Sequence, residues 1–185
     1  MKTEIEARLL NVDAKRFIEK LESVGAKFVG DWLQIRHCYD FKPVDENRWI
    51  RLRTNGKEAA ITIKEVGSAK IDGTKELEFP VPTFEMGDEF LNQLGFFART
   101  KQENRRIQYT LDGVEIDIDF WPHLPTYVEF EAESEQAIKN VCKKLGIPYS
   151  KLTTLDNDSM YKQQGIDVKH TPFLVLEQDR KELIK

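Results

Sequence analysis

Strict alternation of charged and apolar residues marks the first stretch of the chain, residues 2–10. Its members divide into a charged set and an apolar set: Glu4, Glu6 and Arg8, and Ile5, Ala7 and Leu9. Because successive side chains of a strand point to opposite faces, this pattern predicts a strand with one charged and one apolar side. Carboxylates on the same side would lie about 6.6 Å apart and repel each other unless a cation lies between them. A surface strand with solvated charges is the alternative for this stretch taken alone.

Eight further segments favour extended structure: residues 27–41, 49–53, 59–64, 75–79, 96–101, 105–111, 114–120 and 127–132. Asn55-Gly56 and Asp112-Gly113 predict hairpin turns between neighbouring strands. Residues 42–47 form a polar stretch that predicts a loop, and residues 66–74 predict another. We expect Pro80 to end the strand before it, because proline has no N–H to donate within a sheet.

Apolar residues at helical spacing predict three amphipathic helices, at residues 13–25, 84–94 and 134–146. Asp13 and Ser134 are suitable N-caps, and each predicted helix ends in a glycine. A strand with Glu-x-Glu followed by such a helix therefore recurs three times, which indicates a sheet built from related strand–helix units. We expect a short helix near residues 159–161, and the pattern assigns no role to residues 166–185.

A charged side recurs in six of the nine predicted strands and is largely sorted strand by strand into acidic and basic groups. The groups are Glu4/Glu6/Arg8, Arg51/Arg53, Thr62/Lys64, Glu76/Glu78, Asp117/Asp119 and Glu129/Glu131. Roughly eight strands can close into a barrel that holds one small ligand. If these sides face inward, the enclosed charges need partners, and a metal-bound polyphosphate would supply them to both the carboxylates and the cations. A sheet whose charged face is open to water is the alternative.

Composition narrows the functional classes. The chain has 185 residues and a net charge of −4, which suits one domain and argues against general binding to nucleic acid or anionic membranes. No apolar run approaches the length of a membrane span. Two isolated cysteines, Cys38 and Cys142, predict a reducing, cytoplasmic location. The three histidines are scattered and form no zinc signature.

The motifs, in their order along the chain, resemble those of the CYTH superfamily, the triphosphate tunnel metalloenzymes. Glu4-x-Glu6-x-Arg8 is similar to the family's N-terminal Glu-x-Glu-x-Lys strand. The blocks that follow are Arg51/Arg53, Thr62/Lys64, Glu76/Glu78, Arg106, and the stretch from Asp119 to Glu129/Glu131. The resemblance covers residues 1–165 and leaves residues 166–185 as a tail that we expect to pack on the same domain. It implies an α+β fold, a closed antiparallel eight-stranded β-barrel with helices packed on the outside.

The resemblance also implies roles for the charged residues. Metal ligands would be Glu4, Glu6, Asp119, Glu129 and Glu131, and the metal would be Mg²⁺ or Mn²⁺. Phosphate-binding residues would be Arg8, Arg51, Arg53, Lys64 and Arg106. Thr62, Glu76, Glu78 and Asp117 would line the lumen, and Glu4, Glu6 and Arg8 would be the catalytic group.

Two residues depart from the family pattern. Arg8 replaces a lysine, and arginine stays charged where lysine can act as a positioned acid or base. Asn104 stands where the family often has a basic residue, a change that we expect to loosen phosphate binding. The pattern leaves open whether Arg105 or Arg106 faces the lumen.

The leading functional hypothesis is metal-dependent hydrolysis of a small inorganic or organic triphosphate. One alternative is a class IV adenylyl cyclase that converts ATP to cyclic AMP and pyrophosphate. A second alternative is a protein that binds polyphosphate or nucleotide without catalysis. We expect no nucleic-acid or membrane partner, and the sequence leaves a homodimer open.

Overall fold

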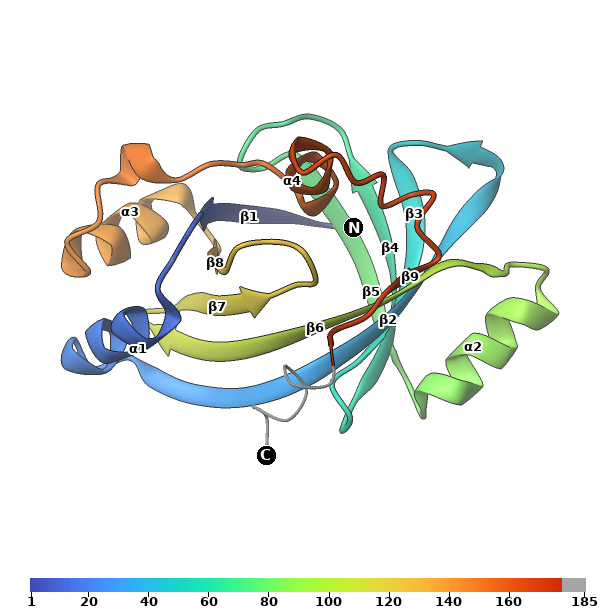
Figure 1. The fold of residues 1–185 in the computed structure, drawn as a ribbon, viewed down its shortest axis with the longest axis horizontal. Coiled ribbons are helices and arrows are strands. Elements are labelled where there is room, and N and C mark those ends of the chain that lie inside the picture. The colour runs from blue at the N-terminus through green and yellow to red at the C-terminus, as the bar shows by residue number, and fades with distance from the viewer. Residues whose placement is uncertain (178–185) are drawn as a thin grey trace.

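One sheet of nine strands organises the chain in the computed structural model, which describes residues 1–177 (Figure 1). The first eight strands are β1 Lys2–Leu9, β2 Lys27–Asp45, β3 Arg48–Thr54, β4 Ala59–Val66, β5 Thr74–Val81, β6 Ala98–Leu111, β7 Val114–Phe120 and β8 Tyr127–Ala132. They pair antiparallel in the order β2-β3-β4-β5-β1-β8-β7-β6, and β6 pairs again with β2. This last pairing closes the barrel, so the predicted eight-stranded closed fold is confirmed.

The strand that closes the barrel is longer than the sequence pattern indicated. Residues 96–101 and 105–111, predicted as two strands, belong largely to the single strand β6. The polar residues between them, 102–104, pair with residues 34–36 of β2, so the hydrogen-bonded ladder holds them extended. The predicted loop at residues 42–47 was also too long, because β2 continues to Asp45 and turns directly into β3.

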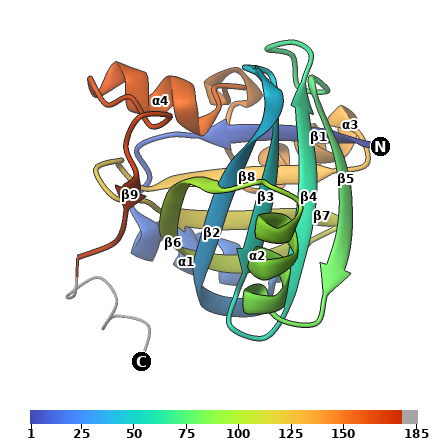
Figure 2. The same cartoon turned by 90° about the vertical axis from the view of Figure 1, so that its right-hand side faces the viewer.

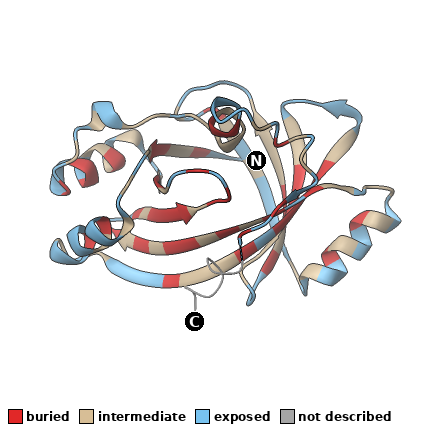
Figure 3. Cartoon of the chain, viewed as in Figure 1, coloured by how far each residue is buried: buried red, intermediate tan, exposed pale blue. Residues whose placement is uncertain are grey.

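Four α-helices lie among residues 1–177: α1 Ala14–Ser23, α2 Phe84–Gln93, α3 Glu135–Lys144 and α4 Asn157–Gln163. The first three cover the outside of the barrel, whereas α4 borders its interior. Asp13 and Ser134 cap α1 and α3 as predicted, each accepting a backbone N–H with its side chain. Thr83 caps α2 in the same way. Helices α1 and α3 pack over β6, β7 and β8, where the largest core cluster includes Leu21, Ile116 and Ile138 (Figures 1 and 3). No helix among the described residues is long and apolar enough to cross a membrane.

Strand β5 differs from its neighbours because its outer side lacks a full cover. Leu77 and Phe79, on the apolar side of this strand, are 51% and 50% exposed. The helix that follows β5, α2, packs instead mainly on β3 and β4 (Figure 2). The strand also continues through Pro80. Proline is tolerated there because β1 pairs with β5 only at residues 74–76, which leaves an open edge beyond.

The C-terminal part of the described chain lies along the barrel. Thr153 forms a bridge with Arg8 of β1, and the short strand β9, Phe173–Leu174, runs parallel to β6. Leu174 and Leu176 are buried. The tail from residue 166 onwards therefore packs on the barrel as far as residue 177, and the rest of the predicted tail lies outside the described residues.

Candidate functional site

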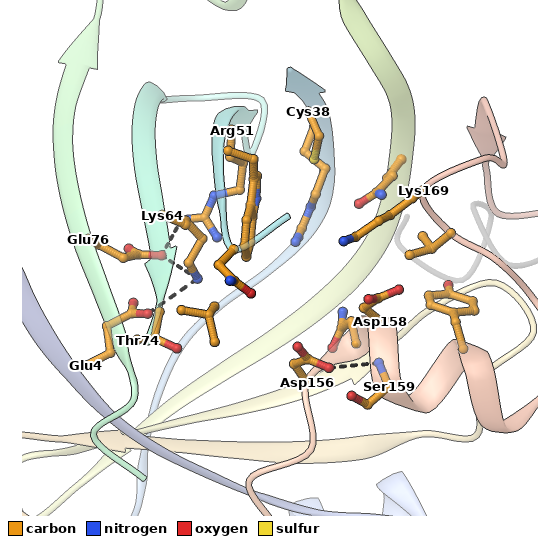
Figure 4. Close-up of a pocket in the computed structure, with 18 of the residues that line it drawn as sticks. Glu4, Cys38, Arg51, Lys64, Thr74, Glu76, Asp156, Asp158, Ser159 and Lys169 are labelled. Carbon is orange, nitrogen blue, oxygen red and sulfur yellow. Dashed lines mark hydrogen bonds and ion pairs between the residues drawn. The ribbon is translucent and has the colours of Figure 1, made fainter. Parts of the chain in front are cut away.

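A cavity of about 1170 Å³ occupies the inside of the barrel. Its lining comes from the inward sides of all eight barrel strands and from residues 156–170 of the C-terminal segment. Figure 4 shows Glu4, Arg51, Lys64 and Glu76 on one wall, with Asp156, Asp158 and Lys169 across the cavity from them. Most residues predicted for the lumen do line it: Glu4, Glu6, Arg8, Arg51, Arg53, Lys64, Glu76, Glu78, Arg106, Glu129 and Glu131.

Strands β1 and β8 bring carboxylates side by side. Glu6 lies directly opposite Glu131 in their antiparallel register. Burial, together with neighbouring carboxylates, raises the pKa of Glu6 and that of Glu131. Burial also raises the pKa of Glu4 to about 8, although Lys64 opposes the shift. The register therefore gathers several carboxylates on one side of the cavity, where a bound cation would relieve their mutual repulsion.

Strands β3 and β4 supply cations that the next strand partly neutralises. Arg51 Nη2 lies 3.4 Å from Glu76 Oε1, and Lys64 forms an ion pair with the same glutamate. Burial acts to raise the pKa of Glu76, but Arg51 and Lys64 outweigh it and lower the pKa to about 2. Arg53 has a weaker partner, Glu78, at 3.7 Å. Repulsion from Arg51, then burial, lowers the pKa of Arg53 to about 10.

Arg106, and not Arg105, faces the lumen. Arg105 lies on the outer side of β6, where its Nη2 lies 2.6 Å from Asp31. Arg106 donates from Nε and Nη2 to the two oxygens of Asp119, at 2.9 and 2.6 Å. It also pairs with Asp117 and Glu129.

Three predicted residues lie beneath the cavity surface. Asp119, Asp117 and Thr62 are buried and do not border the cavity. Both oxygens of Asp119 accept hydrogen bonds, from Arg106 and from Asn104 Nδ2 at 2.8 Å. Thr62 donates to Glu78 Oε2 at 2.7 Å. The structure therefore shows these residues positioning charged side chains, and the role of Asp119 as a metal ligand stays a prediction.

Arg8 holds three parts of the barrel together. Its Nη2 lies 2.5 Å from Glu129 and 3.2 Å from Glu6, and its Nη1 donates to the Leu155 carbonyl at 2.8 Å. Burial acts to lower the pKa of Arg8, but Glu129 and Glu6 outweigh it and raise the pKa. Burial likewise acts to raise the pKa of Glu129, but Arg8 and Arg106 hold it well below its usual range. Arg8 and Glu129 thus remain charged as a pair.

Arg36 is the functional candidate that the sequence reasoning missed. It is 7% exposed and borders the cavity from β2. The alternation of Gln34, Arg36 and Cys38 with apolar Ile35 could have placed it on the inward side. Residues 27–41 were predicted only as extended, without an inward and an outward side, so Arg36 was not among the predicted lumen residues. Trp49, Trp121 and Tyr161 also border the cavity.

No three acidic, histidine or cysteine side chains within residues 1–177 converge on one point as a preformed metal site. This agrees with the chemistry of Mg²⁺, which proteins usually bind through one or two carboxylates plus substrate phosphates. The carboxylates of Glu4, Glu6 and Glu131 border the cavity, so they fit that mode of binding.

Fold and site together define a class of protein: a closed antiparallel β-barrel whose interior is lined by carboxylates together with arginine and lysine side chains. The chain belongs to the CYTH domain family, whose model matches residues 2–158. No curated protein sequence matches the chain closely enough to count as a relative.

Several solved structures share the fold. The PH1012 protein of Pyrococcus horikoshii has 23% identity and a TM-score of 0.71, covering 85% of this chain and 98% of its own. An adenylate cyclase candidate from Vibrio parahaemolyticus has 11% identity and a TM-score of 0.69, covering 87% and 98%. HpAC1 from Hippeastrum, an adenylyl cyclase candidate described as having a dominant triphosphatase activity, has 16% identity and a TM-score of 0.62, covering 89% and 96%. At these identities the likeness establishes the fold.

Proposed function

We propose that this protein hydrolyses a small inorganic or organic triphosphate with the help of Mg²⁺ or Mn²⁺. The observation that carries the proposal is the sorting of charge within one cavity. Carboxylates with raised pKa values lie on β1 and β8, and arginines with incomplete partners lie on β2 and β3. A triphosphate with a divalent metal complements both the carboxylates and the arginines.

The residues would divide the work as follows. Arg51, Arg53, Lys64 and Arg106 would bind phosphate oxygens and orient the phosphate chain for in-line attack. Glu4, Glu6 and Glu131 would hold the metal, which when bound neutralises charge on the phosphate oxygens. Arg8, held by Glu6 and Glu129, would contact phosphate as a fixed cation. A carboxylate of the lumen, or the bound metal itself, would position the attacking water.

Substitution of the acidic wall tests the proposal. We expect Glu4→Gln and Glu131→Gln each to reduce metal-dependent turnover at least about a hundredfold, because each removes a charge that holds the metal. The measurement is release of orthophosphate from a panel of triphosphates under Mg²⁺ and Mn²⁺. Glu19→Gln on the exposed face of α1 is the matched control and should leave turnover unchanged. Full turnover in Glu4→Gln would contradict the assignment.

An adenylyl cyclase is the second candidate, since the cavity of about 1170 Å³, bordered by Trp49 and Trp121, exceeds the needs of inorganic triphosphate. Incubation with ATP separates the two reactions. Cyclic AMP with pyrophosphate would support the cyclase, and orthophosphate would support the hydrolase. If the protein binds triphosphates tightly but forms no product from any of them, it is a non-catalytic binding protein, and both the cyclase and the hydrolase assignments are wrong.

We also infer a cytoplasmic location, because both cysteines are buried as free thiols, and we propose a small-molecule triphosphate as the principal partner.

A further inference from the structure

Arg36 is a buried guanidinium held by neutral groups. Its Nη2 donates to Gln34 Oε1 at 2.7 Å and to the side-chain oxygen of Asn104. The guanidinium carbon lies 4.4 Å from the centre of the Trp121 ring, a cation–π contact. These three neighbours orient the guanidinium group, but none of them carries a negative charge.

The other cations of the inner wall have acidic partners within ion-pair distance. Arg8, Arg51, Arg53, Lys64 and Arg106 each lie within 4.0 Å of at least one carboxylate oxygen. Arg36 has no such partner among residues 1–177, and its Nε has no hydrogen-bond acceptor there. Arg36 is therefore the cavity-lining arginine that has no carboxylate within ion-pair distance in the described part of the protein, and Asp119 compensates its charge only in part.

Arg36 lacks an acidic partner, and the register of β2 with β3 also places it next to another cation. Arg36 lies directly opposite Arg53, and Cys38 lies opposite Arg51. Like charges directly opposite each other on neighbouring strands are destabilising. Burial, then repulsion from Arg51, Arg53 and Arg106, lowers the pKa of Arg36 to about 9. An anion bound between Arg36 and Arg53 would relieve both the repulsion and the missing partner.

We propose that Arg36 is a phosphate-binding residue that forms an anion subsite with Arg51 and Arg53. The proposal rests on the proposed triphosphate function and adds a residue that no sequence motif assigned. In this subsite Asn104 would favour phosphate binding, whereas the family resemblance alone predicts that it loosens it. Its side-chain oxygen fixes Arg36, and its Nδ2 donates to Asp119, so the amide separates the guanidinium of Arg36 from that carboxylate. Arg36 remains available to a ligand as a result.

Two substitutions test the subsite from opposite directions. Arg36→Met removes the cation and nearly keeps its aliphatic volume. Gln34→Glu keeps Arg36 and supplies the missing carboxylate in an almost isosteric side chain. Arg105→Met is the matched control, because Arg105 lies outside the lumen and pairs with Asp31. The probe is diimidotriphosphate, a triphosphate analogue with bridging N–H groups that resist hydrolysis, and its affinity is measured by calorimetry in Mg²⁺.

We expect Arg36→Met to weaken binding of the analogue about tenfold to a hundredfold, the range for a hydrogen bond to a charged group. Gln34→Glu should also weaken binding and should raise the thermal midpoint of the ligand-free protein, because it pairs a buried charge. Affinity equal to wild type in Arg36→Met, or in Gln34→Glu, would overturn the subsite while leaving the proposed function intact. Absence of binding by the wild-type protein would overturn the proposed function, and the subsite with it.

Discussion

Arg8 shows how one substitution within a motif changes what the residue can do. The family resemblance gives a lysine at this position, which can act as a positioned acid or base, whereas arginine stays charged. In the structure Arg8 contacts Glu6, Glu129 and the Leu155 carbonyl together. A lysine presents one nitrogen where arginine presents a planar fork, so it cannot satisfy the same three acceptors in this geometry. Arg8 therefore links β1, β8 and the C-terminal segment as well as bordering the cavity.

Arg8→Lys is expected to lower the free energy of unfolding by about 1–3 kcal/mol, since it loses a charged hydrogen bond to a buried carbonyl. Urea denaturation followed by circular dichroism measures this difference. Arg16→Lys, on the exposed face of α1, is the control and should be nearly neutral. If Arg8→Lys is as stable as that control, the three-way contact contributes nothing measurable.

At the scale of single elements, side-chain hydrogen bonds tie α2 to the barrel. Asp88 of α2 accepts from the Tyr39 hydroxyl and lies 2.8 Å from Nδ1 of His37, both on β2. Asn92 donates to the other oxygen of Asp88 at 3.1 Å. Burial acts to raise the pKa of Asp88, but the hydrogen bonds from Tyr39 and His37 outweigh it and lower the pKa from 3.8. This network was not visible in the sequence, because its members are about fifty residues apart.

Asp88→Asn is expected to destabilise the protein at neutral pH by about 1–3 kcal/mol, because it weakens these hydrogen bonds. The sign of the pH dependence follows from the lowered pKa. The unfolded chain binds the proton of Asp88 more readily, so this contribution is present above pH 3.8 and is lost as the pH falls through the lower pKa of the folded state. Urea midpoints of wild type and Asp88→Asn should therefore converge at acidic pH. Glu85→Gln, exposed on the same helix, should show no comparable pH-dependent difference. If the difference in urea midpoint between wild type and Asp88→Asn stays constant with pH, the charge of Asp88 does not have this role.

The element scale also separates what alternation predicts from what it does not. Period two correctly assigned the inner and outer sides of β1, β3, β7 and β8. Alternation also gives β5 an apolar outer side, but it does not show that no helix fully covers this side, where Leu77 and Phe79 remain half exposed. Their alternation is the same as that of buried strands, and only the path of α2 across β3 and β4 decides that they are left uncovered.

At the scale of the whole molecule, the net charge of −4 gives no hint of a cation-lined interior. A ligand that binds only the folded state stabilises it in proportion to the logarithm of its concentration. We expect inorganic tripolyphosphate at a hundred times its dissociation constant to add about 2.7 kcal/mol to the free energy of unfolding. Thermal denaturation, with sodium chloride at matched ionic strength as control, measures this effect. An identical midpoint in both salts would contradict polyanion binding in the barrel.

The sequence pattern predicted most of the barrel strands, the caps Asp13 and Ser134, and the chemical character of the lumen. Alternation with a period of two assigns a face to each residue, and sorted charges on one face call for opposite charges on a ligand. The tertiary structure alone decided which charges find partners within the protein. Strand register placed Arg36 opposite Arg53, buried Asp119 beneath Arg106 and turned Arg105 outward. These outcomes depend on distances of a few ångströms between residues far apart in the chain, and hydrophobic and charge patterns contain no information about such distances.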